Sequence, residues 1–221
     1  MSSSRSPGKS HSKDDHHLLS AKTQDKVFLR NSAGDRPKSP ASPDKLPLSP
    51  PPARADPANA GKIILREPAR RDGYPVNQLV ALCPPLDKNS TYCNLLQCTD
   101  FSSTGVVAEL DGRLVAFTSG YIPPAQPDAL FIWQVAVHSD YRDQGLGKKM
   151  IRHLLERKSC ASVQYLRTTI TKSNRPSWGL FQSLAKTLNS EILSQVYFDS
   201  ERHFGGEHES EYMVVVGPLK R

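Results

Sequence analysis

A strand, a glycine-containing turn and the start of a helix follow one another in the second half of this chain, and they constrain its fold most strongly. The apolar run 129–137 is typical of a buried strand, and the turn 142–147 directly precedes apolar residues at helical spacing. Such a junction presents unpaired backbone N–H groups at the positive end of a helix dipole. Because Gly145 and Gly147 lack Cβ atoms, a phosphate can approach the backbone closely. The stretch therefore predicts an anion site.

The spacing of the glycines decides which kind of phosphate loop this is. Neither G-x-x-x-x-G-K-[ST] nor G-x-G-x-x-G is present, whereas Arg-x-x-Gly-x-Gly is. That pattern resembles the pyrophosphate loop of the GNAT acetyltransferase superfamily, and an ordinary strand-to-helix turn is the alternative. The resemblance implies acetyl-CoA as the co-substrate, held by the strand, the turn and the start of a later helix. The implied contacts are Gln134, Val135, Ala136, Val137, Arg142, Asp143, Gln144, Gly145, Leu146, Gly147, Lys148 and Asn174.

The first sixty residues differ in composition from the remainder. They hold nine of the 18 prolines, are rich in serine and show no apolar periodicity. Burial in such a segment cannot offset an ordering cost of about 1 to 2 kcal/mol per residue. We therefore predict a disordered Pro/Ser-rich tail over 1–60 and a folded domain over 61–221.

Charge and cysteine content exclude several functional classes. The tail contains ten of the 29 Lys and Arg residues and six of the 22 acidic ones, which leaves the domain with an excess of only three positive charges. This balance argues against nucleic acid as a partner. The four cysteines have no zinc-binding spacing, so we expect no metal and a cytoplasmic protein with free thiols. No apolar run is long enough to span a membrane.

The periodicities of the domain predict the order β α α β β β α β α β β. Strands are expected at 62–66, 105–110, 113–121, 129–137, 164–170, 192–198 and 212–216, with an Asp-Gly hairpin at 111–112. Helices are expected after Asp72, after Asn89 or Ser90, over 148–158 and after 173–177. This predicts an α/β (α+β) domain of the GNAT type, a mixed twisted sheet of six to seven strands with about four helices.

Three further stretches narrow the choice of acceptor substrate. They are 83–98, 119–135 and 168–174, and together with the closing 216–219 they resemble the L-2,4-diaminobutyrate acetyltransferases over about 63–219. The resemblance implies acetyl transfer from acetyl-CoA to the γ-amine of L-2,4-diaminobutyrate, a step of ectoine synthesis, and a homodimer. A GNAT enzyme for another amine, such as a polyamine, an aminoglycoside or a protein lysine, and a non-catalytic acetyl-CoA sensor are the alternatives.

A diamino acid carries two ammonium groups, so its site should supply acidic and aromatic side chains. By the resemblance, the substrate-binding residues are Asp87, Tyr92, Trp133, His208 and Glu211, and the catalytic ones are Glu211 with His208 as a relay. Each also has an ordinary structural interpretation: Asp87 can cap a helix, the two aromatic residues can be core, and the last two can be surface residues. Many GNAT enzymes have a tyrosine seven residues after Asn174, where this chain has Phe181, so the general acid is open.

Overall fold

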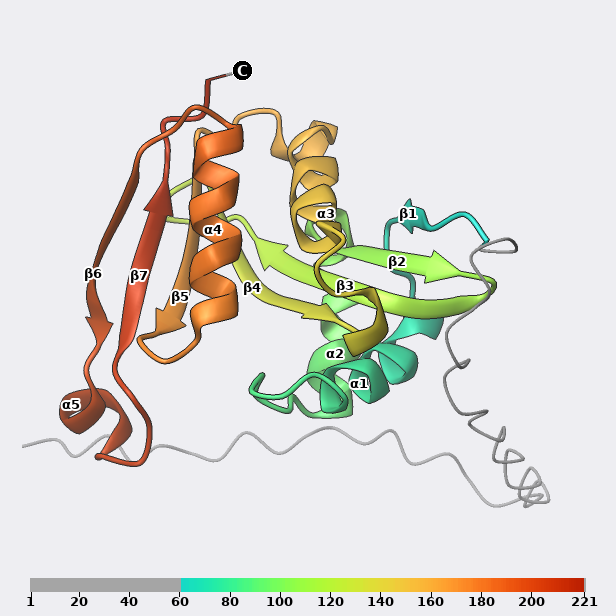
Figure 1. The fold of residues 1–221 in the computed structure, drawn as a ribbon, viewed down its shortest axis with the longest axis horizontal. Coiled ribbons are helices and arrows are strands. Elements are labelled where there is room, and N and C mark those ends of the chain that lie inside the picture. Colours follow the sequence, from blue (N-terminus) through green and yellow to red (C-terminus); the bar gives the residue numbers. More distant parts are fainter. Residues whose placement is uncertain (1–60, 221) are drawn as a thin grey trace, which may run out of the picture. The chain divides into compact units, whose positions relative to one another are not determined.

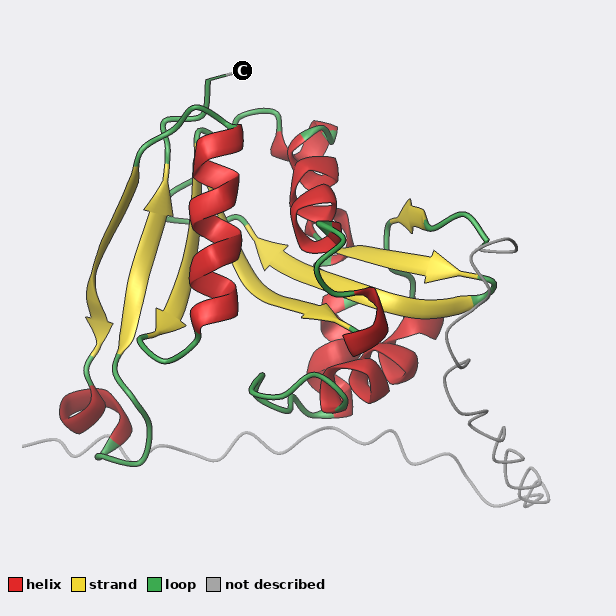
Figure 2. Cartoon of the chain, viewed as in Figure 1, coloured by secondary structure: helices red, strands yellow, loops and turns green. Residues whose placement is uncertain are grey.

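The computed structural model describes residues 61–220, which form a mixed seven-stranded sheet with helices on both faces (Figures 1 and 2). The strand order is β1-β2-β3-β4-β5-β7-β6, and only the β4–β5 pair is parallel. The strands are β1 (Ile64–Arg66), β2 (Val106–Leu110), β3 (Arg113–Tyr121), β4 (Ala129–Val137), β5 (Tyr165–Thr171), β6 (Ile192–Phe198) and β7 (Glu211–Val216). The predicted α/β sheet is confirmed, whereas the predicted tail 1–60 lies outside the described residues.

The helices begin close to their predicted caps, with one addition. They are α1 (Gly73–Ala81), α2 (Thr91–Gln97), α3 (Leu146–Leu155), α4 (Arg175–Thr187) and α5 (Ser200–Phe204). Of the two cap candidates for α2, Ser90 is the one whose side chain accepts a hydrogen bond from the Cys93 N–H. Helix α3 begins at the glycine turn itself rather than at Lys148. The sequence did not predict α5, which is one turn long and capped by Asp199.

Two separate apolar clusters cover the two faces of the sheet. Helices α3 and α4 pack on one face, where Met150, Ile151 and Leu184 are fully buried. Helix α1 packs on the other face, where Val76 and Val80 contact the cluster of Phe117 and Ala136. In Figure 1, α3 lies above β2 and β3, α4 lies in front of the sheet beside β5, and α1 and α2 lie below β2 and β3. Within residues 61–220, no helix is long and apolar enough to cross a membrane.

An ion-pair group fixes the start of the domain against the sheet. Arg66 donates to both carboxylate oxygens of Asp72 at 2.7 and 2.8 Å, and its Nε donates to Glu109 at 2.7 Å. Asp72 stands at the predicted N-cap of α1, but its carboxylate accepts from Arg66 and from the Ala69 N–H instead of capping that helix. Burial alone would raise the pKa of Asp72, yet these hydrogen bonds hold it below its ordinary value.

Candidate active site

An extra residue in β4 changes which side chains face which side of the sheet. Ser119 of β3 pairs with Gln134 and Gly120 pairs with Ile132, so Trp133 is a β-bulge without a partner. Before the bulge, Leu130 and Ile132 pack on the α3–α4 side; after it, Val135 and Val137 do. The bulge therefore turns Gln134 and Ala136 toward α1 and α2.

Just before the bulge, β4 and β5 separate. Their parallel pairing covers only Ala129–Phe131 against Tyr165–Arg167, while the rest of β5 pairs with β7 alone in the described chain. The edge of β4 that follows is therefore open to a ligand. Two cavities lie along this opening, and Pro85, Leu86 and Asn174 line both.

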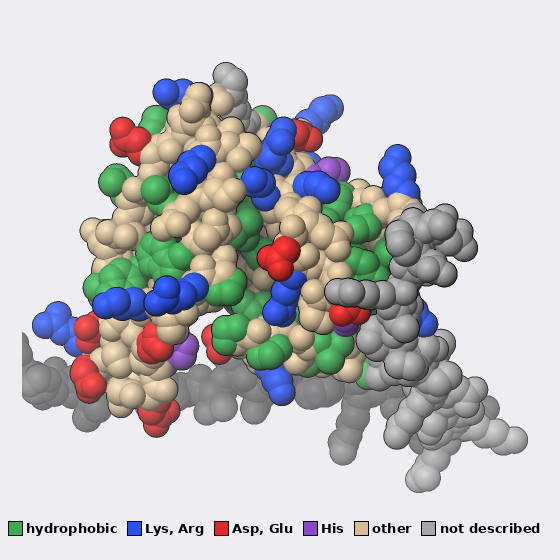
Figure 3. All heavy atoms as spheres, in the orientation of Figure 1, with side chains coloured by type: hydrophobic (Ala, Val, Ile, Leu, Met, Phe, Trp, Pro, Cys, Tyr) green, Lys and Arg blue, Asp and Glu red, His purple; other side chains and the backbone are tan. Residues whose placement is uncertain are grey.

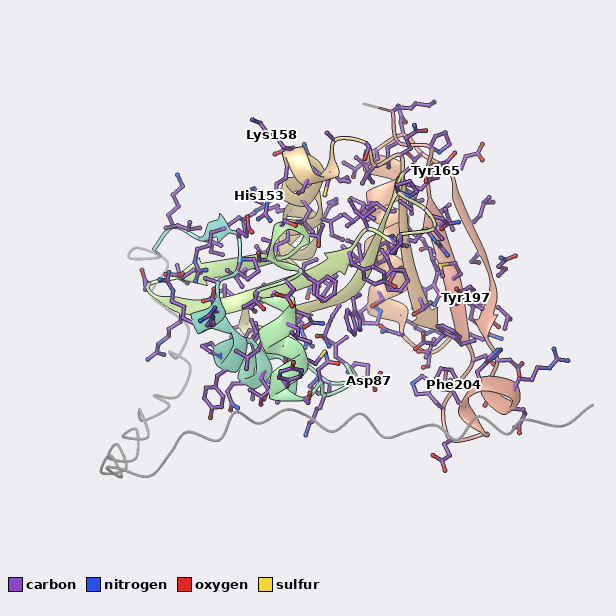
Figure 4. All side chains as sticks on the ribbon, turned by 180° about the vertical axis from the view of Figure 1, so that it is seen from behind. Asp87, His153, Lys158, Tyr165, Tyr197 and Phe204 are labelled. Carbon is purple, nitrogen blue, oxygen red and sulfur yellow. The ribbon has the colours of Figure 1, made fainter. Side chains whose placement is uncertain are left out.

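The first cavity has a volume of about 830 Å³ and collects residues from seven separate segments of the chain. Seen from the α3–α4 side, the surface is notched between the part that carries α5 and the part that carries α1 and α2 (Figure 3). Figure 4 places Asp87 at the rim of the α1–α2 layer, on the same side of the molecule as Phe204 of α5. The lining residues are Pro85, Leu86, Asp87, Asn89, Phe101, Tyr121, Phe131, Trp133, Gln134, Thr169, Ile170, Thr171, Ser173, Asn174, Phe198, Glu207, His208, Glu209 and Glu211.

Four of the five predicted substrate residues meet in this cavity. Asp87, Trp133, His208 and Glu211 line it, although they lie up to 124 positions apart in the sequence. Tyr92 does not: it lies near the start of α2, is 70% exposed and lines neither cavity. The role of Tyr92 thus stays a prediction without support from its position.

The segment that carries His208 and Glu211 is held by α5. Ser200 donates from its hydroxyl to the His208 carbonyl at 2.7 Å, and its N–H donates to Ser210 Oγ at 2.9 Å. The rings of Phe204 and His208 lie 4.7 Å apart. His208 Nδ1 lies 2.8 Å from the Glu209 carbonyl oxygen, which can only accept. This contact places a proton on Nδ1, so Nε2 is the acceptor whenever the ring is neutral.

The second cavity, of about 540 Å³, lies at the glycine turn. Gly145 is the N-cap of α3 with φ +69°, so the first N–H groups of a ten-residue helix point at the cavity. Arg142 Nε donates to the Val137 carbonyl at 3.1 Å, and Lys148 Nζ donates to Ser183 Oγ at 3.0 Å. Both side chains bring positive charge to the cavity wall.

Most of the residues predicted to contact acetyl-CoA line this cavity. They are Val135, Val137, Arg142, Asp143, Gly145, Leu146, Gly147, Lys148 and Asn174. The other three lie elsewhere. Gln134 lines the first cavity, Ala136 is fully buried against the α1 side, and Gln144 is exposed with its side chain donating to the Asp140 carbonyl. Only main-chain contacts to the cofactor remain open to Ala136.

The structure adds residues that the sequence reasoning did not assign. Thr169 and Thr171 share one side of β5 and face the first cavity, and Glu209 accepts a 3.4 Å hydrogen bond from the Ser173 N–H. The sequence held a signal for the two threonines, because residues two positions apart in a strand point to the same side. The aromatic wall gave no such signal, since its members come from different elements: Phe101, Tyr121, Phe131 and Phe198.

One thiol lies beside the second cavity. Cys83 is buried and its Sγ lies 3.4 Å from the Val137 carbonyl oxygen. Burial raises the pKa of this thiol, although Arg142 opposes the shift. Cys83 is therefore a neutral packing group rather than a nucleophile. Within residues 61–220, no three His, Cys, Asp or Glu side chains are placed to hold a metal ion.

Known proteins match this chain over most of its length. Residues 74–185 match the model of the acetyltransferase (GNAT) family. An L-2,4-diaminobutyric acid acetyltransferase of Methylotuvimicrobium alcaliphilum is 48% identical over 158 residues, which cover 72% of this chain and 92% of that protein. The corresponding protein of Vibrio cholerae is 45% identical over 150 residues, 68% of this chain and 87% of its own.

A solved structure has the same arrangement. A diaminobutyrate acetyltransferase from Paenibacillus lautus, in complex with L-2,4-diaminobutyric acid and coenzyme A, is 36% identical with a TM-score of 0.70. The match covers 73% of this chain and 98% of that one.

Proposed function

Because the chain belongs to the acetyltransferase (GNAT) family and, within it, to the L-2,4-diaminobutyric acid acetyltransferases, we propose that it transfers an acetyl group from acetyl-CoA to the γ-amine of L-2,4-diaminobutyrate. The product is N4-acetyl-L-2,4-diaminobutyrate, an intermediate of ectoine synthesis. The observation that carries this proposal is the pair of adjoining cavities along β4, one suited to an anionic donor and one to a cationic acceptor.

The donor cavity suits the pyrophosphate of acetyl-CoA. The helix N-terminus at Gly145 offers backbone N–H groups, and Arg142 and Lys148 supply the opposite charge. The open edge of β4 lies between this turn and the first cavity. A pantetheine arm that pairs with that edge would bring the thioester to Asn174, where the cavities meet.

The acceptor cavity suits a diamine. Asp87, Glu207, Glu209 and Glu211 line it, and none of its lining residues is Lys or Arg. Two ammonium groups therefore find carboxylates, while the aromatic wall encloses the short carbon chain. Neutral donors, including Thr169 and Thr171, remain for the substrate carboxylate.

Acetyl transfer requires a neutral amine. With a lysine-like pKa of about 10.4, roughly one γ-amine in 2,500 is neutral at pH 7, a penalty on the order of 4.6 kcal/mol. A general base typically accelerates such a reaction by a factor of about 10² to 10⁴, and this gain is comparable to the penalty for deprotonating the amine. We assign proton removal to Glu211, with His208 Nε2 as the relay, and binding of the α-ammonium to Asp87.

The tetrahedral intermediate and the thiolate need partners as well. We assign the oxyanion to a backbone N–H within 134–137 that points to the open edge of β4 rather than to β3. Phe181 belongs to α4, is 2% exposed and packs in the apolar core. Because phenylalanine has no hydroxyl, the position where many GNAT enzymes have a tyrosine supplies no general acid here. Asn174 caps the thirteen-residue helix α4 at the junction of the cavities, and the positive end of that helix favours a departing thiolate.

The acceptor can be tested by steady-state assay of thiol release with diaminobutyrate, ornithine, lysine and spermidine. We expect the highest kcat/KM with diaminobutyrate, because the cavity provides carboxylates for two amines and neutral donors for a carboxylate. Equal or faster turnover of spermidine would show a polyamine enzyme instead. If acetyl-CoA binds but no CoA thiol is released in the presence of any of the four amines, the protein is a sensor rather than an enzyme.

The base can be tested with Glu211→Gln, for which we expect kcat/KM at pH 7 to fall by about 10². The deficit should narrow at higher pH, because the amine then loses its proton unaided. Glu207→Gln removes the same charge from the same cavity and serves as the matched control. A loss under about threefold in Glu211→Gln, or an equal loss in both variants, would remove Glu211 from the proton path.

The donor turn can be tested with Gly145→Ala. A Cβ here meets no atom within 4 Å, so its effect comes from the positive φ, a strain of roughly 1 to 2 kcal/mol. We expect KM for acetyl-CoA to rise by about tenfold while KM for diaminobutyrate stays within about twofold. Gly112→Ala, with φ +76° and equal space in the β2–β3 hairpin, is the control. Equal effects of both variants on KM for acetyl-CoA would contradict the assignment.

We also propose that the enzyme is a homodimer in the cytoplasm. The edge strand β6 leaves large apolar side chains exposed, with Leu193 at 67% and Tyr197 at 45%, as an interface requires. The four cysteines are free thiols, which suits a reducing compartment, and a native disulfide among them would contradict that location.

The interface can be tested by sedimentation equilibrium. We expect a dimer for the natural protein and a monomer for Leu193→Lys combined with Tyr197→Lys, because both substitutions place a charge on an exposed apolar side chain of the edge strand β6. Gln182→Lys on the exposed side of α4 is the control and should stay dimeric. A monomeric natural protein would refute the proposal.

A further inference from the structure

A chain of side-chain amides connects α1, α2 and β4 through the loop that carries Asp87. Asn77 Nδ2 donates to Asn94 Oδ1 and to the Asn89 carbonyl, both at 2.9 Å, and Asn94 Nδ2 donates to Gln97 Oε1 at 2.8 Å. At the other end, Asn89 Nδ2 donates to Gln134 Oε1 at 3.0 Å. Gln134 Nε2 then donates to the Asp87 carbonyl at 3.2 Å.

These amides are buried where apolar side chains would be the simpler choice. Asn94, Gln97 and Gln134 are 0, 1 and 7% exposed. The neighbouring layer between α1 and the sheet is apolar, and an unpaired buried amide is costly. The amide group therefore needs a function that packing alone does not supply. Hydrogen bonds differ from apolar contacts because they fix direction and distance.

The group they fix is the segment 87–89. Residues 87–90 lie outside helices and strands. The residue before them, Leu86, packs against the apolar cluster on the α1 side of the sheet. Asp87 is exposed, and within the described residues no hydrogen bond or ion pair holds its carboxylate. Gln134 holds both ends of this segment, the carbonyl of Asp87 and the side chain of Asn89.

The same bulge that turns Trp133 into the acceptor cavity turns Gln134 toward this loop. Asp87 and Trp133 line the same cavity, so the Gln134 side chain sets their relative position. A loose loop would let the Asp87 carboxylate move away from its ligand, and misplacement of about 1 Å can lose most of such an interaction.

We propose that Asn89 and Gln134 are positioning residues that hold Asp87 for the α-ammonium of the acceptor and thereby select substrates that carry an α-amine. This rests on the proposed function, in which the acceptor is a diamino acid. The amides do not touch the reacting atoms through their side chains. They act through Asp87, so their effect should appear in acceptor binding and in selectivity rather than in the chemical step.

The first test compares Asn89→Ala with the natural enzyme, using diaminobutyrate and 4-aminobutyrate, which lacks the α-amine. We expect KM for diaminobutyrate to rise by about tenfold, the size of one or two net hydrogen bonds. KM for acetyl-CoA and kcat/KM for 4-aminobutyrate should stay within about twofold. Gln182→Ala, an amide removed from the exposed side of α4, is the control and should change none of these. Equal losses with both acceptors would overturn the proposal.

The second test is a double-mutant cycle of Asn89→Ala with Asp87→Asn. If Asn89 acts through Asp87, it should cost less than about twofold in kcat/KM once Asp87→Asn is present, whereas independent losses would multiply. Gln134→Met, which removes both amide bonds at similar volume, should give the same pattern. Thermal unfolding of each variant separates misfolding from mispositioning.

The outcomes distinguish the two proposals. If Asp87→Asn has no effect on diaminobutyrate turnover, the assignment of Asp87 in the proposed function fails. If Asp87→Asn is impaired but Asn89→Ala and Gln134→Met behave like the natural enzyme, only the positioning role fails.

Discussion

One extra residue in β4 determines where both cavities lie. Trp133 has no partner in β3, and the side chains of β4 change faces at that point. The pairing of β4 with β5 ends two residues earlier, at Phe131, so the backbone that follows is open between the two halves of the sheet. An edge inside a sheet is normally a liability, because unpaired N–H and C=O groups must find partners. In the proposed function the partner is a ligand, and the same divergence separates the walls of the acceptor cavity.

The two cavities divide the charges of the two substrates. The donor cavity combines a helix N-terminus with Arg142 and Lys148, while the acceptor cavity combines four carboxylates with no lysine or arginine among its lining residues. Four carboxylates around one cavity favour a cation there, and a diamine supplies two positive charges. An anionic cofactor is disfavoured in the acceptor cavity for the same reason. Each substrate is therefore directed to its own side of β4 before any specific contact forms.

The sequence predicted the elements better than it predicted the directions of side chains. The glycine turn, the hairpin and the seven strands follow from local signals that need no tertiary information. The bulge does not, because strict alternation along β4 would place Trp133 with Val135 and Val137. Gln134 and Ala136 were expected at the cofactor because the resemblance implies contacts along all of 134–137, but the bulge turns their side chains toward α1 and α2. Helix α5 escaped prediction because five residues are too few to show a period, and its cap at Asp199 resembles an ordinary turn.

The buried amides show why a protein keeps polar groups where apolar ones would fit. Gln97 Nε2 and Ser119 Oγ are buried without a hydrogen-bond partner among the described residues, and Ser119 pairs with Gln134 across β3 and β4. A fully apolar layer would avoid that penalty, since each such group costs about 1 to 3 kcal/mol. Apolar side chains can shift against one another with little loss of contact. The hydrogen bonds of the amide chain, in contrast, fix one relative position of α1, α2 and the loop that carries Asp87. The buried amides thus lower the stability of the fold but fix the position of the exposed Asp87 carboxylate. Such an arrangement is useful only where that carboxylate must bind a ligand.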